Sequence, residues 1–220
     1  MMKTRHLFSF LLVGILSVSA KGTTPQKTTP LFWPESRLIP IQVHSKDAFA
    51  DGLEFTITEF ANSLLPLYSP SMKQWNQVSK LTYRRSSVAF ANNRNPNIKA
   101  GISIVKANDW LQELNIKNLA RYTASLQNLY KNRFIPLNSE NNFSPISGSG
   151  FLVGSPYNMV HYQVVSENDP NKITEIRDFI TQIDDVLVIL SFESPQSLAN
   201  HNTNRALNLM ESLSSLDDLE

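Results

Sequence analysis

The strongest constraint on the fold is a succession of three β-rich runs near the carboxyl end, over residues 157–166, 173–181 and 185–193. The first two are separated by Asn, Asp and Pro, which favour chain reversal, so the runs predict an antiparallel meander. Residues 186–190 (VLVIL) are apolar on both faces. This pattern is typical of a central strand that is covered on each side.

Two earlier segments add strands to this picture. Residues 53–60 alternate apolar and polar side chains over most of their length, and so do residues 98–105. A period of two predicts strands on a sheet with one covered face.

Helices are expected to supply the cover. We expect a short helix from Asn108 or Asp109 to Leu114, a second over residues 119–130, and a last one over residues 195–213 whose cap is Ser194. The predicted fold class is therefore α+β, an antiparallel β-sheet meander covered by helices in an α/β/α sandwich.

The amino terminus has the pattern of an export signal. Lys3 and Arg5 precede an apolar run, residues 7–16, and small residues follow as far as Ala20. This predicts a signal peptide over residues 1–20 and an exported protein, periplasmic or extracellular. An uncleaved anchor is the alternative, but the run is shorter than the roughly 20 residues that span a bilayer. No later run is long enough, so we expect no transmembrane segment after cleavage.

The remaining chain is expected to form one domain. Residues 21–37 are rich in Thr, Pro and Lys and predict a flexible tether. Residues 38–214 continue without a second change in composition and predict a single α+β domain. Residues 215–220 end in acidic side chains, which oppose the helix dipole and predict a fraying tail.

Composition excludes several functional classes. The 20 basic and 19 acidic side chains nearly balance, so nucleic acid is not an expected partner. The chain has no cysteine, which excludes disulfides, a thiol nucleophile and Cys-containing zinc sites. The four histidines have no metal-ligand spacing. We therefore expect no metal and no cofactor.

Two features are candidates for catalysis. His161 falls within a predicted strand, where a hydrogen-bonded structural histidine is the favoured interpretation. Residues 147–150 (SGSG) fit neither a nucleophile elbow nor a dinucleotide loop, because a strand-like segment follows them. They predict a turn at the entry to a strand. His201 is expected on the exposed face of the last helix.

The binding candidates are Tyr83, Arg84, Arg85 and Trp33. The first three form the densest basic spot, after a strand-like segment, and arginine beside an aromatic ring suits an acidic partner. Adjacent residues of a strand face opposite ways, so at most one arginine would serve a given face. A charge-protected edge strand is the favoured alternative. Trp33 lies beside the tether, where its indole could anchor a partner.

The order of elements then suggests a family. Asn97-Ile98 opens the strand before the helices, and Ser191-Phe192 closes the sheet before the last helix. Over residues 78–213 this order resembles the Mog1/PsbP-like fold, which includes the DcrB-like bacterial envelope proteins. The resemblance implies an antiparallel sheet between helical layers. It also implies a partner role in larger assemblies, which in this family include photosystem II, the GTPase Ran and secretion-system effectors.

The sequence departs from that family in two ways. It lacks a cysteine at the end of the signal, so a lipid anchor is not carried over, and it has an added piece at residues 63–75. We expect an exported, non-enzymatic accessory protein that binds a protein partner or an envelope assembly. The alternative is an envelope hydrolase or a small-molecule-binding protein, with a site between sheet and helices that uses His161 and a serine.

Overall fold

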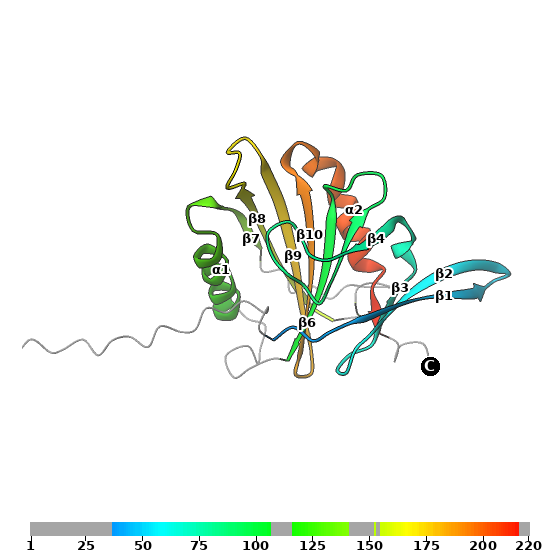
Figure 1. Ribbon diagram of the computed structural model, residues 1–220. Helices are drawn as coiled ribbons and strands as arrows, with labels where there is room; N and C mark the ends of the chain where they lie inside the picture. Colours follow the sequence, from blue (N-terminus) through cyan, green and yellow to red (C-terminus); the bar gives the residue numbers. More distant parts are fainter. Residues whose placement is uncertain (1–36, 107–115, 141–151, 153–154, 216–220) are drawn as a thin grey trace, which may run out of the picture. The chain divides into compact units, whose positions relative to one another are not determined.

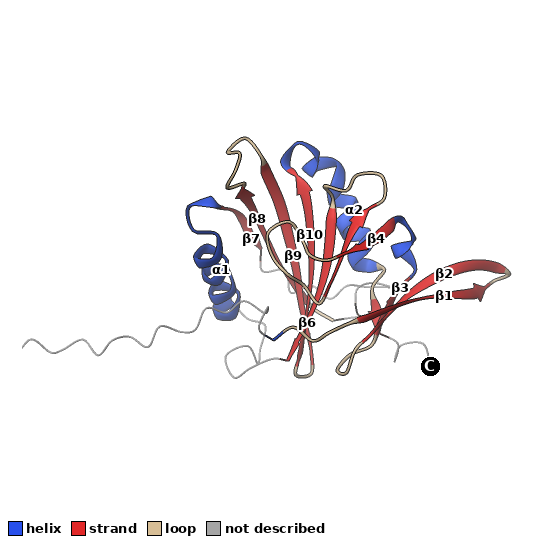
Figure 2. Cartoon of the chain, in the orientation of Figure 1, coloured by secondary structure: helices blue, strands red, loops and turns tan. Residues whose placement is uncertain are grey.

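A computed structural model describes residues 37–106, 116–140, 152 and 155–215. Figure 2 shows that strands outweigh helices in this part. These residues include two α-helices, α1 (Ile116–Tyr130) and α2 (Ala199–Glu211), with short 3-10 turns at Pro70–Gln74, Lys131–Arg133 and Gln196–Leu198. The strands are β1 (Gln42–Ala50), β2 (Leu53–Ala61), β3 (Leu67–Ser69), β4 (Trp75–Val78), β5 (Val88–Asn92), β6 (Lys99–Lys106), β7 (Phe134–Glu140), β8 (Tyr157–Val165), β9 (Ile173–Ile183), β10 (Val186–Pro195) and β11 (Ser214–Ser215).

Seven of the strands form a large antiparallel sheet in the order β4-β5-β6-β10-β9-β8-β7. The prediction of a central strand at residues 186–190 is confirmed, because β10 pairs with β6 on one side and β9 on the other (Figure 1). The residues of β10 from Val186 to Ser194 are all buried. The predicted meander is also confirmed, since β8, β9 and β10 are successive neighbours.

Helix α1 covers one face of the large sheet. Its stripe of Leu119, Tyr122, Leu126 and Tyr130 packs in one cluster with side chains of β8, β9 and β10, among them Tyr162 and Ile189. Sequence periodicity predicted this stripe over residues 119–130, and the helix is three residues longer at its start.

Helix α2 covers the opposite face. Ala206, Leu209 and Met210 belong to a second cluster, which includes Val188 and Phe192 of β10. The predicted cap at Ser194 is wrong. β10 continues to Pro195, the hydroxyl of Ser194 is buried within the sheet, and α2 starts after a 3-10 turn without a side-chain cap. The expected α+β fold with helices on both faces is confirmed.

A second sheet, in the order β1-β2-β3-β11, contributes to the cluster under α2. Phe60 of β2 meets Phe90 of β5 edge to face, with ring centroids 5.9 Å apart. Strand β2 was predicted, whereas its partner β1 was not. The two form a long hairpin that turns at Asp51 and Gly52, both with positive φ. Positive φ is what a tight two-residue hairpin turn requires, and Gly and Asp tolerate it.

Several predictions lie outside the described residues. They are the signal peptide, the tether up to residue 36, Trp33, the short helix at residues 108–114, the turn at residues 147–150 and the tail from residue 216. The domain boundaries also stay a prediction. In the described part of the chain, neither helix has both the length and the apolar character needed to cross a bilayer.

Candidate functional site

A groove lies at the end of the large sheet where β8 turns into β9 and β10 ends. Its volume is about 580 Å³. Its lining comes from four segments far apart in the sequence. Most of the lining residues are polar in type, although polar and apolar atoms contribute about equally to the exposed surface. They are Thr82, Tyr83, Asn97, Lys99, Ser166, Asn171, Lys172, Ile173, Thr174, Pro195, Gln196 and Ser197. Three of these segments begin or end strands of the sheet, so the groove has a rigid frame.

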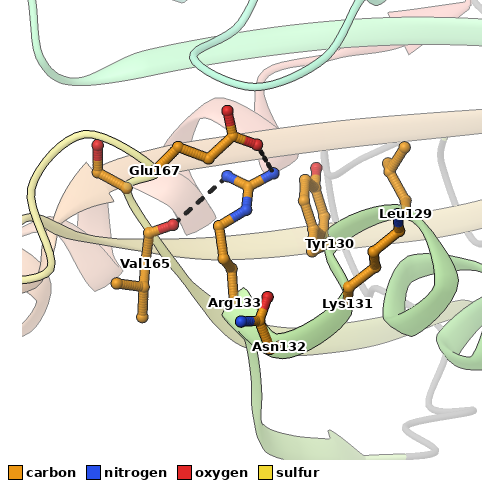
Figure 3. Close-up of a pocket in the computed structure, with 8 residues that line it drawn as sticks. Leu129, Tyr130, Lys131, Asn132, Arg133, Val165 and Glu167 are labelled. Atoms are coloured by element: carbon orange, nitrogen blue, oxygen red, sulfur yellow. Dashed lines mark hydrogen bonds and ion pairs between the residues drawn. The ribbon is translucent and has the colours of Figure 1, made fainter.

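A second hollow of about 480 Å³ adjoins the groove and shares Ser166 with it. It is formed where α1 ends and the chain enters β7, and the β8–β9 turn faces this corner (Figure 3). Lys131 has a φ of 54° directly after the helix. Left-handed backbone cannot continue a helix, so the chain turns there and presents Lys131, Asn132 and Arg133.

Arg133 connects the two hollows. Its guanidinium lies 2.8 Å from the carboxylate of Glu167 and donates a hydrogen bond to the carbonyl of Val165 (Figure 3). It also lies 5.9 Å from the ring centroid of Tyr130 and 5.7 Å from that of Tyr83. Tyr83 lines the groove and Arg133 lines the second hollow, so their contact lies between the two.

The structure describes three of the four predicted binding residues and places them in three different environments. Tyr83 is half-buried and lines the groove, and its hydroxyl lies 3.4 Å from that of Thr174. Arg84 is buried, with its side chain fully enclosed. Arg85 is exposed. We therefore no longer expect Arg84 to contact a partner, whereas contact by Tyr83 and Arg85 stays a prediction.

The local structure explains this division. Residues 79–87 are an irregular connection between β4 and β5 and not the strand that the sequence suggested. Leu81 is fully buried against Gly101 of β6, where a Cβ atom would lie 2.9 Å from the Leu81 side chain. The backbone N–H of Thr82 donates to Glu193 at 2.8 Å. These contacts hold the segment on the sheet and direct Arg84 inward.

Arg84 is the centre of a closed polar network. It forms an ion pair with Asp178 of β9 and donates to the hydroxyls of Tyr162 and Ser191. The hydroxyls of Tyr122 and Tyr162 donate to the same carboxylate at 2.9 Å and 3.0 Å. A buried charge is tolerated only when it is paired and hydrogen-bonded in this way.

The protonation states of the network follow from its burial. Burial alone would lower the pKa of Arg84, but Asp178 and the neighbouring phenols raise it well above its ordinary value. Burial raises the pKa of Tyr130 to about 12 and also raises those of Tyr122 and Tyr162. The phenols thus remain neutral hydrogen-bond donors near neutral pH. The network is fixed in one state and is sealed from the groove.

Glu193 lies under the groove. Burial raises its pKa above the ordinary value, against the opposing effects of Arg84 and of the hydrogen bond from Thr82. It is fully buried and does not line the groove. An acid without access to a ligand supports structure rather than proton transfer.

His161, the candidate for a catalytic base, is held by neighbouring side chains. The side chain of His161 contacts the carboxylate of Glu175 at 2.7 Å, and Arg177 pairs with the same carboxylate. The interpretation of His161 as a hydrogen-bonded structural residue is thus supported, although its partner is a side chain and not the backbone. His201 lies on the exposed side of α2, as expected. Among the described residues no group of three His, Asp or Glu side chains has a metal-binding arrangement.

The sequence did not reveal Lys99, Lys172 and Arg133 as part of a site. Each is a single basic residue at the end of an element, far from the others along the chain. The available signal was one of position: Lys172 follows the predicted turn between the first two β-rich runs, and Arg133 follows the end of the helix predicted over residues 119–130. Their convergence depends on strand order, which single residues do not show.

Comparison with known proteins identifies the fold. No family model matches the sequence, and no curated protein matches it. Cyanobacterial PsbP from Synechocystis aligns with a TM-score of 0.50 and 10% identity, over 76% of this chain and 96% of that chain. LpqN, involved in cell envelope biogenesis of Mycobacterium tuberculosis, aligns with a TM-score of 0.44 and 11% identity, over 79% of this chain and 91% of that chain. A Mog1 mutant aligns with a TM-score of 0.41 and 12% identity, over 76% of this chain and 93% of that chain.

The chain therefore has the Mog1/PsbP fold, as its order of elements suggested. The likeness is one of fold alone, because the sequence identity is low.

Proposed function

We propose that this chain is an exported, non-enzymatic accessory protein that holds a protein partner in the groove beside Tyr83. One contrast carries the proposal. The buried charged groups Arg84 and Asp178 pair with each other and have no access to solvent. The groove, in contrast, is lined by cationic side chains, hydroxyls and an aromatic ring at the ends of strands. An enzyme would instead place groups with perturbed pKa in contact with its pocket. Tyr130 is such a group, but it lines the second hollow and not the groove.

The lining of the groove supports a protein partner over a small apolar ligand. Small-molecule sites are lined predominantly by hydrophobic and aromatic side chains. Here Ile173 and Pro195 are the aliphatic members of a lining that otherwise carries hydroxyls, amides, two ammonium groups and one phenol. Such a surface suits the peptide groups and polar side chains of another protein.

The proteins of similar fold support an accessory role, but their names identify no partner for this chain. PsbP is the neighbour with the highest TM-score of those above, and LpqN is described as involved in cell envelope biogenesis. These names favour the hypothesis that this chain has an accessory role in an envelope assembly.

A retention experiment tests the proposal. The mature chain, immobilised, is exposed to solubilised native envelope, and retained proteins are identified by mass spectrometry. We expect one protein to be retained, and its recovery to fall about tenfold with Tyr83→Ala combined with Lys172→Ala. The matched control is Lys106→Ala, because Lys106 lies at the other end of the same sheet. Equal recovery with the groove variant and the control would contradict the proposal.

Export has its own test. The protein is purified from the periplasm or medium of its host, and its amino terminus is sequenced. Cleavage after Ala20 predicts Lys21 as the first residue. An intact Met1 in a cytoplasmic fraction would remove export and leave the binding proposal standing.

A further inference from the structure

We infer that the partner segment that enters the groove is an extended acidic peptide. The inference rests on the proposed function and specifies the chemistry of its occupant. Four cationic side chains line the groove and its adjoining hollow, Lys99, Lys131, Lys172 and Arg133, against the single carboxylate of Glu167. The whole chain is nearly neutral, so this excess is local.

The availability of these cations differs. Arg133 is engaged by Glu167, and Lys172 lies 4.0 Å from Asp169 with its side chain 79% exposed. Lys99 and Lys131 form no ion pair with any residue that the structure describes. The charge of Lys99 lowers the pKa of Glu193, but Glu193 is buried and does not line the groove. Two ammonium groups, those of Lys99 and Lys172, therefore line the main groove with no acidic residue among its lining.

The other lining groups suit an extended backbone. Thr82, Thr174 and Ser197, which carry hydroxyls, and Asn97 and Asn171, which carry amides, line the same groove as the two lysines. Such groups satisfy peptide N–H and C=O groups that a bound strand would otherwise leave unpaired. The Tyr83 ring, fixed against Arg133, offers a flat face for one apolar side chain of the peptide.

The observations favour a peptide over a nucleic acid. Binding to a phosphate backbone needs many cations along an extended path, and it gains little from a short groove in which two of the four cations have nearby carboxylates. Carboxylates of a peptide can pair with the two lysines and leave the remaining lining for the peptide backbone.

The test uses three fluorescent probes and the mature full chain. The first is an eight-residue peptide rich in Glu and Asp with one Phe. The second has Gln and Asn at the acidic positions, and the third is an oligothymidine of equal charge. Fluorescence anisotropy measures each affinity. We expect the acidic peptide to bind at least tenfold more tightly than the amide peptide and the oligonucleotide, and to weaken as salt is raised.

Variants assign the binding to the groove. Lys99→Gln with Lys172→Gln is expected to weaken the acidic peptide roughly three- to tenfold, since each exposed charge contact contributes modestly. Lys106→Gln, at the opposite end of the strand that carries Lys99, is expected to have no effect. Thermal melting checks that each variant is folded.

The outcomes separate the two proposals. If the double lysine variant leaves peptide affinity unchanged, or if the oligonucleotide binds as well as the peptide, the acidic-peptide inference is overturned. If the retained envelope protein still depends on Tyr83 and Lys172 in that case, the proposed function survives without it. If the peptide binds in the groove but the recovery of the retained protein is the same with the groove variants, the proposed function fails and the peptide site stands.

Discussion

The Arg84 network and the tip of the β1–β2 hairpin are opposite cases within one chain. In the network, an ion pair with both side chains at 0% exposure lies in the interior of the large sheet. At the hairpin tip, Phe49 and Leu53 are 74% and 71% exposed. Charged groups are thus inside and large apolar groups outside, the reverse of the usual distribution.

The two regions make different demands on the fold. The buried pair exists only because Tyr122, Tyr162 and Ser191 surround it with hydrogen-bond partners, so each member depends on the others. The exposed side chains of Phe49 and Leu53 are positioned only by the pairing of the hairpin strands, in which Phe49 lies opposite Glu54. The first region should be intolerant of change and the second tolerant.

The largest expected effect is at Asp178. Asp178→Ala removes the carboxylate and leaves the Arg84 guanidinium charged and buried, which should cost about 3–5 kcal/mol of unfolding free energy. Urea denaturation measures it. The double variant Arg84→Met with Asp178→Leu removes both charges and should recover most of the loss. A cost below about 1 kcal/mol for Asp178→Ala would mean that water reaches the pair.

Gly101→Ala should have the next largest effect. The new Cβ would lie 2.8 Å from the Ser86 hydroxyl and 2.9 Å from the Leu81 side chain, so these two side chains, which hold residues 79–87 on the sheet, must move. Overpacking of this kind costs typically about 1–3 kcal/mol. Because the same segment carries Tyr83, peptide affinity at the groove should fall along with stability.

The hairpin supplies the matched control for that variant. Gly52 has a φ of 78° and no neighbouring atom within 4 Å. Gly52→Asn should change stability little, because asparagine tolerates this backbone conformation. A larger loss at Gly52 than at Gly101 would contradict the contrast between the two regions.

Much of the fold could be predicted from the sequence because local patterns determine it. Residues 186–190 have no polar face, so only a strand covered on both sides suits them, and that is where β10 lies. The stripe of α1 repeats at helical spacing. The cap at Ser194 failed because Ser-Pro has the same local signature whether a helix starts at once or a strand continues to the proline.

The site was less predictable because it depends on contacts between distant residues. Arg84 and Arg85 are adjacent and identical in type, and only the position of Asp178 on β9 decides which one turns inward. Lys99 and Lys172 are 73 positions apart in the numbering and meet only through the order of β6, β10 and β9. Tyr83 was found because an aromatic residue beside arginines is a local signal.

The buried Glu193 predicts a pH dependence of a particular sign. Its pKa is raised in the folded protein, so its contribution to stability is complete below its ordinary pKa and is lost as pH rises through the folded value. Glu193→Gln cannot ionise. Its melting temperature relative to the wild type should therefore increase from about pH 4 to about pH 8. A difference that is constant across that range would show that Glu193 has the same pKa in both states.

The smallest expected effect is at the hairpin tip. Phe49→Ser should change the free energy of unfolding by no more than about 0.5 kcal/mol, because its ring is already in water. Phe60→Ala, in the partner strand of the same hairpin, removes a ring with 0% exposure that packs on Phe90 and should cost about 3–5 kcal/mol. Urea denaturation of both variants compares them directly. If Phe49→Ser costs as much as Phe60→Ala, the tip is covered in solution and the division between the two regions is wrong.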